Sequence, residues 1–192
     1  MKYGEIKMYD IADGPGLRVS IFVSGCSHHC KECHNPQLWN PDFGEVYTEK
    51  TEAEILEKLS NKHINGLTLL GGEPFEIYNQ KELLQLVKKA RAANPDLSIW
   101  CYTGYTLDED LIPCGKVYTE HTDEMLKLLN VLVDGKFEIA KKDVSLLWCG
   151  SYNQRIIDMD LYNQTGEIKE LFDYEKKKVL RQEYEDRMKA TE

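Results

Sequence analysis

Long apolar runs are missing from this chain of 192 residues. The longest runs, such as 131–133, fall far short of the roughly 20 residues that a membrane-spanning helix requires. The first residues lack the apolar stretch of a signal peptide, and neither an internal repeat nor a low-complexity linker is present. We therefore expect a globular, cytoplasmic protein. In that compartment the six cysteines are expected to be reduced thiols rather than disulfides.

Basic residues are also scarce, with 24 Lys and Arg against 33 Asp and Glu, a net charge of -9. An acidic surface repels phosphate groups, so we expect neither a nucleic acid nor a membrane as a partner. No Ser-His-Asp arrangement and no G-x-x-x-x-G-K phosphate loop occurs in the sequence. These absences argue against triad hydrolysis and against phosphate-loop nucleotide binding.

Apolar and β-branched residues alternate with amphipathic segments along the chain. Strands are predicted at 17–23, 66–70, 98–102 and 131–133. Helices are predicted after a capping box that begins at Thr51, over 80–93, and around 123–129. This order predicts an α/β fold with parallel strands, whose carboxyl-end loops converge on one site. The length suits one domain over 1–172, followed by a charged helical tail over 173–192.

Three of the six cysteines follow the first predicted strand within eight residues: Cys26, Cys30 and Cys33. Thiolates are the ligands of iron–sulfur clusters, and three of them on a four-iron cluster leave one iron open for chemistry. Zinc is the competing metal, with His28, His29 or His34 as its fourth ligand. The spacing alone leaves both metals open.

The motif Cys-x3-Cys-x2-Cys after an apolar strand resembles that of the radical S-adenosylmethionine superfamily. Gly71-Gly72-Glu73-Pro74, after the next strand, resembles the second motif of that superfamily. Five further stretches resemble the family of glycyl-radical activases that serve the anaerobic ribonucleoside-triphosphate reductase: DGPGLR (13–18), FVSGC (22–26), IWCYTGYTLDE (99–109), NVLVDGKF (130–137) and GSYNQRIID (150–158). The resemblance covers roughly residues 4–158.

The resemblance implies a role for each motif residue. Cys26, Cys30 and Cys33 would ligate a 4Fe–4S cluster whose open iron binds S-adenosylmethionine. The backbone near Glu32, Cys33 and His34 would lie against the adenine, while Gly71, Gly72 and Glu73 would meet the methionyl amino group. Asp134 and Lys136 resemble an Asp-x-Lys at a strand end in related activases, and Lys136 would neutralise the methionyl carboxylate. No catalytic residue is implied beyond the cluster and the cofactor.

The resemblance further implies that the reductase is a protein substrate and that an electron donor such as flavodoxin or ferredoxin reduces the cluster. The chain is shorter than a full barrel of about 250 residues, so we expect a partial (β/α) barrel that is open on one side. The polar residues Asn153, Gln154 and Arg155 either lie at the reductase interface or cap the barrel internally. Two other functions stay open: activation of another glycyl-radical enzyme, and a zinc-binding interaction module without catalysis.

Overall fold

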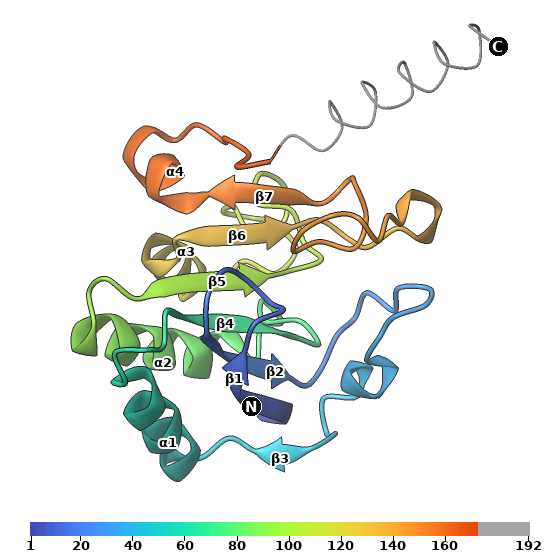
Figure 1. Cartoon of the computed structure of the whole chain (residues 1–192). Coiled ribbons are helices and arrows are strands. Elements are labelled where there is room, and N and C mark those ends of the chain that lie inside the picture. The colour runs from blue at the N-terminus through green and yellow to red at the C-terminus, as the bar shows by residue number, and fades with distance from the viewer. Residues whose placement is uncertain (173–192) are drawn as a thin grey trace, which may run out of the picture.

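The computed structural model describes residues 1–172, and the predicted helical tail over 173–192 lies outside these residues. Seven strands form one sheet in the order β3-β1-β2-β4-β5-β6-β7 (Figure 1). The strands are β1 (Lys2–Asp10), β2 (Arg18–Val23), β3 (Glu45–Val46), β4 (Gly66–Gly71), β5 (Ser98–Tyr102), β6 (Val131–Asp134) and β7 (Arg155–Asp158). The helices are α1 (Glu49–Leu59), α2 (Gln80–Ala93), α3 (Thr122–Leu128) and α4 (Met159–Thr165), with 3-10 turns η1 (Pro36–Trp39) and η2 (Ile139–Lys141).

The centre of the sheet is parallel, as the alternation of strands and helices predicts. Strands β2, β4, β5 and β6 pair in parallel, whereas β1 and β3 on one side and β7 on the other are antiparallel. The prediction of parallel strands is therefore wrong for the edges. The short connection between β1 and β2 and the return of the chain after β6 both reverse the chain without a crossover helix, and such connections give antiparallel pairs. The sheet is α/β and not closed, and a partial barrel stays a prediction.

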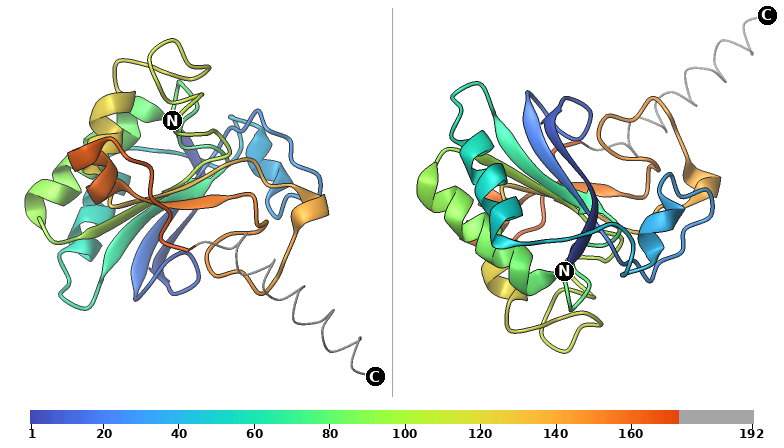
Figure 2. Two further views of the ribbon diagram at one scale, coloured as in Figure 1. Left: turned by 90° about the horizontal axis from the view of Figure 1, so that it is seen from above. Right: turned by 90° about the horizontal axis from the view of Figure 1, so that it is seen from below.

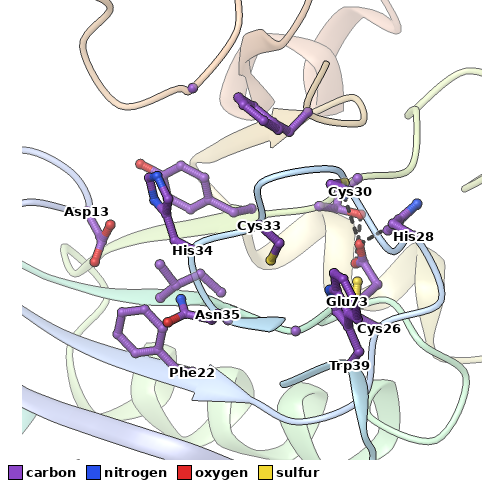
Figure 3. Close-up of a pocket in the computed structure, with 18 of the residues that line it drawn as sticks. Asp13, Phe22, Cys26, His28, Cys30, Cys33, His34, Asn35, Trp39 and Glu73 are labelled. Atoms are coloured by element: carbon purple, nitrogen blue, oxygen red, sulfur yellow. Dashed lines mark hydrogen bonds and ion pairs between the residues drawn. The ribbon is translucent and has the colours of Figure 1, made fainter. Parts of the chain in front are cut away.

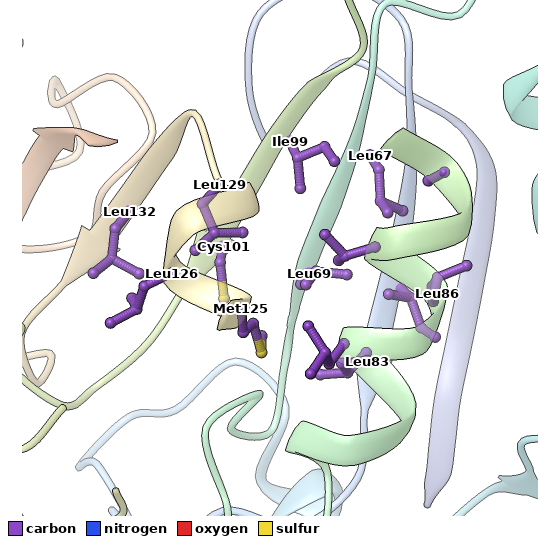
Figure 4. Close-up of a cluster of buried hydrophobic side chains, with 14 of the residues drawn as sticks. Leu67, Leu69, Leu83, Leu86, Ile99, Cys101, Met125, Leu126, Leu129 and Leu132 are labelled. Carbon is purple, nitrogen blue, oxygen red and sulfur yellow. The ribbon is translucent and has the colours of Figure 1, made fainter. Parts of the chain in front are cut away.

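One face of the sheet packs against helices. In β4 and β5, Leu67, Leu69, Ile99 and Cys101 alternate toward this face and are fully buried against α2 and α3 (Figure 4). Every second residue of each strand packs against the apolar face of an amphipathic helix, which repeats every 3.6 residues. Both patterns are visible in the sequence. The alternate residues of the same strands point to the opposite face, which carries the pocket described below.

The start of α1 differs from the prediction. The helix begins at Glu49 with Thr48 as its N-cap, and Thr51 is the third helical residue. The hydroxyl of Thr48 accepts the Thr51 N–H at 3.2 Å, and the Thr48 N–H donates back to the Thr51 hydroxyl at 3.4 Å. Thr48 and Thr51 thus form the reciprocal cap, because two threonines three residues apart satisfy two free N–H groups together.

The turns η1 and η2 both lie at the end of the sheet toward which β4, β5 and β6 point (Figures 1 and 2). None of the helices within residues 1–172 combines the length and the apolar character needed to cross a membrane.

Candidate functional site

A pocket of about 430 Å³ opens at the carboxyl ends of the parallel strands (Figure 3). Most of its lining comes from the cysteine loop after β2, the turns after β4 and β5, and the segment after β6, and the segment before β2 adds Ala12 and Asp13. Lining residues from these turns include Cys26, Cys30, Cys33, Gly71, Gly72, Glu73, Thr103, Gly104 and Gly135. The expected convergence of the strand-end loops is therefore confirmed. It follows from parallel pairing, which brings the carboxyl ends of neighbouring strands to one edge.

The cysteine loop is closed by backbone hydrogen bonds to η1. The N–H of Gly25 donates to Leu38 O at 2.8 Å, and the N–H of Cys26 donates to Trp39 O at 3.2 Å. Between these anchors the chain turns sharply, with positive φ at His29 (47°) and Glu32 (60°). The result is a compact loop that brings three half-buried thiols to one pocket.

The thiols of this loop fit an iron–sulfur cluster by the chemistry of their donor set. All six cysteines are free, and the three in the loop line the same pocket. Burial raises the pKa of Cys26 to about 12 and also raises that of Cys30, although the positive charge of Lys136 opposes the second shift. Thiolates in such a place require a compensating cation, which iron supplies.

The zinc alternative receives less support from the geometry. The imidazole Nε2 of His28 lies 3.0 Å from Glu73 Oε2, and its ring packs 4.3 Å from that of Tyr105, so this side chain is already engaged. Within residues 1–172, no three His, Cys, Asp or Glu side chains are grouped to hold a single metal ion. The structure therefore offers no preformed single-ion site.

The turn after β4 packs against the start of the cysteine loop. The N–H of Gly72 donates to Val23 O at 2.7 Å, and the N–H of Glu73 donates to Gly25 O at 2.8 Å. Gly71 has φ +111°, and a Cβ on Gly72 would lie 2.5 Å from Gly25 O. Both positions therefore need glycine, the first for its conformation and the second for close backbone contact.

Glu73 lines the pocket, but its carboxylate is held from within the protein. Oε1 accepts the Phe75 N–H at 2.9 Å and the Thr103 hydroxyl at 2.7 Å. Oε2 accepts the Gly104 N–H at 2.8 Å and lies 3.0 Å from His28. Only 1% of Glu73 is exposed. The side chain therefore joins the turns after β4 and β5 to the cysteine loop.

Asp134 and Lys136 are not among the residues that line the pocket, although Gly135 and Phe137 beside them are. Asp134 is fully buried, and its two carboxylate oxygens accept Arg155 Nε at 2.8 Å and Nη2 at 2.5 Å. The Leu107 N–H adds a third bond at 2.8 Å. Both oxygens of this carboxylate are thus occupied by protein groups, whereas Lys136 is exposed and its charge acts on Cys30.

The polar stretch 153–155 is also used internally. Asn153 Nδ2 donates to Lys136 O at 2.9 Å, and Gln154 Nε2 donates to Gly135 O at 3.1 Å. Together with the Arg155–Asp134 pair, these bonds fasten the start of β7 to the end of β6. Of the two expectations for this stretch, the geometry favours internal capping over a reductase interface.

Several lining residues were not predicted as site residues: Asp13, Phe22, Asn35, Trp39, Leu70, Tyr102, Phe137 and Gln154. Asp13 reaches the pocket because the buried Arg18 donates to Pro15 O at 3.2 Å and Thr68 donates to Asp13 O at 2.9 Å. These bonds fold the segment before β2 over the sheet. Alternation within the strands was the available signal for Phe22, Leu70 and Tyr102, since each is out of phase with the residues facing the helices.

The fold and the thiol loop define a class, an open α/β protein built around an iron–sulfur centre. Accordingly, residues 12–157 match the family model described as a 4Fe-4S single cluster domain. The anaerobic ribonucleoside-triphosphate reductase-activating protein of Escherichia coli K12 is 40% identical over 156 residues, covering 80% of this chain and 96% of that protein. The proteins of the same name from Pasteurella multocida and Enterobacteria phage T4 are 42% and 40% identical, covering 84% and 81% of this chain and 100% and 93% of their own lengths.

The chain therefore belongs to the family of anaerobic ribonucleoside-triphosphate reductase-activating proteins. This confirms the family resemblance that the motifs carry.

Proposed function

We propose that this protein is a radical S-adenosylmethionine enzyme that makes a glycyl radical on the anaerobic ribonucleoside-triphosphate reductase. The observation that carries the proposal is one pocket that combines the three thiols of the cysteine loop with the Gly71-Gly72 turn. A 4Fe–4S cluster at this place supplies one electron, which splits S-adenosylmethionine into methionine and a 5′-deoxyadenosyl radical that takes a hydrogen atom from a glycine. The names of the relatives support the choice of reductase.

The chain itself contributes ligands and shape. Cys26, Cys30 and Cys33 would hold the cluster, and S-adenosylmethionine would bind beside them in the same pocket. Because Glu73 is saturated by four protein groups, contact with the methionyl ammonium falls to the backbone of Gly71 and Gly72. Glu73 acts as a positioning residue that holds the turn after β4 against the cysteine loop.

The apolar part of the pocket suits the adenosyl group. Phe22, Leu70 and Tyr102 form one wall from three adjacent strands, and Glu32, Cys33 and His34 line the pocket from the cysteine loop. A flat, weakly polar ring system is bound by such surfaces, with backbone groups giving the polar contacts. An apolar lining holds water weakly, which would help to protect a reactive radical.

A protein substrate fits the rim of the pocket. Ile11 is 79% exposed and Val144 is 92% exposed. The first lies two residues before the lining residue Asp13, and the second lies in a segment that reaches the cysteine loop through the Lys142–Glu32 ion pair at 3.6 Å. Exposed apolar side chains beside a site mark a surface for another protein. We place the reductase here, with flavodoxin or ferredoxin as the electron donor.

The test is an anaerobic mixture of reconstituted protein, reductase, S-adenosylmethionine and reductant, read by electron paramagnetic resonance. We expect a glycyl radical only in the complete mixture, and release of 5′-deoxyadenosine that is slow without the reductase and faster with it. A colourless protein that retains zinc rather than iron would overturn the proposal. Equal 5′-deoxyadenosine release with and without the reductase would remove the role of the partner in closing the site.

A further inference from the structure

Two residues that line the pocket, Trp39 and Tyr102, carry a buried donor without an acceptor in the described part of the chain. The indole Nε1–H of Trp39 is shielded from solvent, and no hydrogen-bond partner for it exists within residues 1–172. Trp100 offers a contrast, because its indole donates to Ser98 Oγ at 3.1 Å. A buried N–H without an acceptor lowers stability, and native proteins rarely leave one unless a missing group completes it.

Trp39 belongs to the wall beside the thiols. It lines the same pocket as Cys26, Cys30 and Cys33 (Figure 3). The Cys26 N–H donates to Trp39 O at 3.2 Å, so the two residues are joined through the backbone. On the other side, the ring of His29 meets the indole edge to face at 4.8 Å. The Trp39 backbone is therefore held by Cys26, and its indole is held by the ring of His29.

We propose that Trp39 donates its indole N–H to a sulfur of the iron–sulfur cluster and thereby raises the reduction potential of that cluster. The acceptor is an inorganic sulfide or a ligating thiolate, both of which carry negative charge. Reduction adds a further negative charge to the cluster, so a hydrogen bond to sulfur stabilises the reduced form more than the oxidised form. Trp39 is a tuning residue and touches neither the glycine nor the adenosyl group in this role.

The inference rests on the proposed cluster site, and other orphaned groups do not compete for the same role. The hydroxyl of Tyr102 is also buried without a partner among the described residues, but this side chain packs in the apolar cluster of Phe22, Leu38 and Leu70, away from any backbone bond to a cysteine. Trp39 alone among the tryptophans lines the pocket. Trp39 lies at the end of η1, and its backbone carbonyl accepts the Cys26 N–H, so the residue sits directly beside the first thiol of the loop.

The first test is the Trp39→Phe variant, which keeps an aromatic ring and removes the N–H. We expect full iron content, a more negative midpoint potential in an electron paramagnetic resonance titration, and altered iron–sulfur stretching frequencies in resonance Raman spectra. The reduction equilibrium should change about three- to tenfold, or about 28 to 59 mV for one electron. The matched control is Trp148→Phe, which removes an indole outside the pocket and should leave the potential unchanged.

The second test uses the unmutated protein, so that it does not depend on the variant folding. With 15N-labelled indole, pulsed electron paramagnetic resonance of the reduced cluster should show one 15N coupling, and solvent exchange into deuterium oxide should remove one coupled proton. An unchanged potential in Trp39→Phe together with no 15N coupling would overturn the inference. Loss of the cluster from the wild-type protein would instead count against the proposed function itself.

Discussion

The Arg155→Ala substitution tests how the end of β6 is held. Arg155 bonds both oxygens of Asp134, which is fully buried, and reaches the half-exposed Asp108 at 2.7 Å. The hydrogen bonds to Asp134 and to Asp108, together with the charge on Asp108, raise the pKa of Arg155 and keep the guanidinium charged. Removing the arginine leaves a buried carboxylate with only the Leu107 N–H for compensation.

The magnitude follows from burial. Breaking a buried ion pair from one side costs about 3 to 5 kcal/mol, whereas the exposed Asp108 contact is worth about 0 to 1 kcal/mol. We therefore expect Arg155→Ala to lower the free energy of unfolding by about 3 to 5 kcal/mol, and the control Asp108→Ala to lower it by about 1 kcal/mol or less. Adding Asp134→Asn to Arg155→Ala should restore at least about 1 kcal/mol, because the uncompensated charge is removed.

The assay is anaerobic urea unfolding, followed by circular dichroism, of five apo proteins: the wild type, Arg155→Ala, Asp134→Asn, the double variant of these two, and Asp108→Ala. The double-mutant cycle gives the Arg155–Asp134 coupling. Equal, small effects of Arg155→Ala and Asp108→Ala would refute the reasoning and return Arg155 to a surface role. Since the structure places this arginine in an internal pair, reductase should still accelerate S-adenosylmethionine cleavage in a folded Arg155→Lys protein.

Three further predictions concern the pocket. Replacing any one of the three loop cysteines by alanine should abolish cluster retention, measured as iron content, whereas the fully buried Cys101→Ala should keep the cluster at a cost of roughly 1 kcal/mol; a full cluster in any loop variant would contradict the ligand assignment. Gly72→Val should reduce both the iron content and the S-adenosylmethionine affinity measured by calorimetry, because the new side chain would collide with Gly25 O. Normal values for both would show that the turn tolerates a side chain. Burial, with the carboxylate of Asp10, raises the pKa of Asp13 from 3.8 to about 7. The folded protein then binds more protons than the unfolded chain between these values, so stability should fall as pH rises from about 4 to 7; Asp13→Asn should flatten that slope, and an unchanged slope would contradict it.

The sequence predicted the regular elements near the centre of the molecule well. The helix over 80–93 and the strand over 98–102 coincide with α2 and β5. In both segments the apolar residues recur with a regular period, and that period indicates the type of element without any knowledge of the fold. Strand β1 was not predicted, because most of its residues are only partly buried and its sequence mixes polar and apolar types without a clear period. Its strand character comes from pairing with β2 and β3.

The sequence by itself identified the candidate ligands, because the spacing of three cysteines and a Gly-Gly turn is local and needs no fold to be recognised. The tertiary structure alone decided which side chains have polar atoms left to contact a ligand. Glu73 and Asp134 look equally available in the sequence, yet each carboxylate is saturated by groups from distant strand ends. Trp39 looks like a core residue and instead presents an unpaired N–H to the thiol pocket. Hydrogen-bond partners are set by residues far apart in the chain, so only packing reveals them.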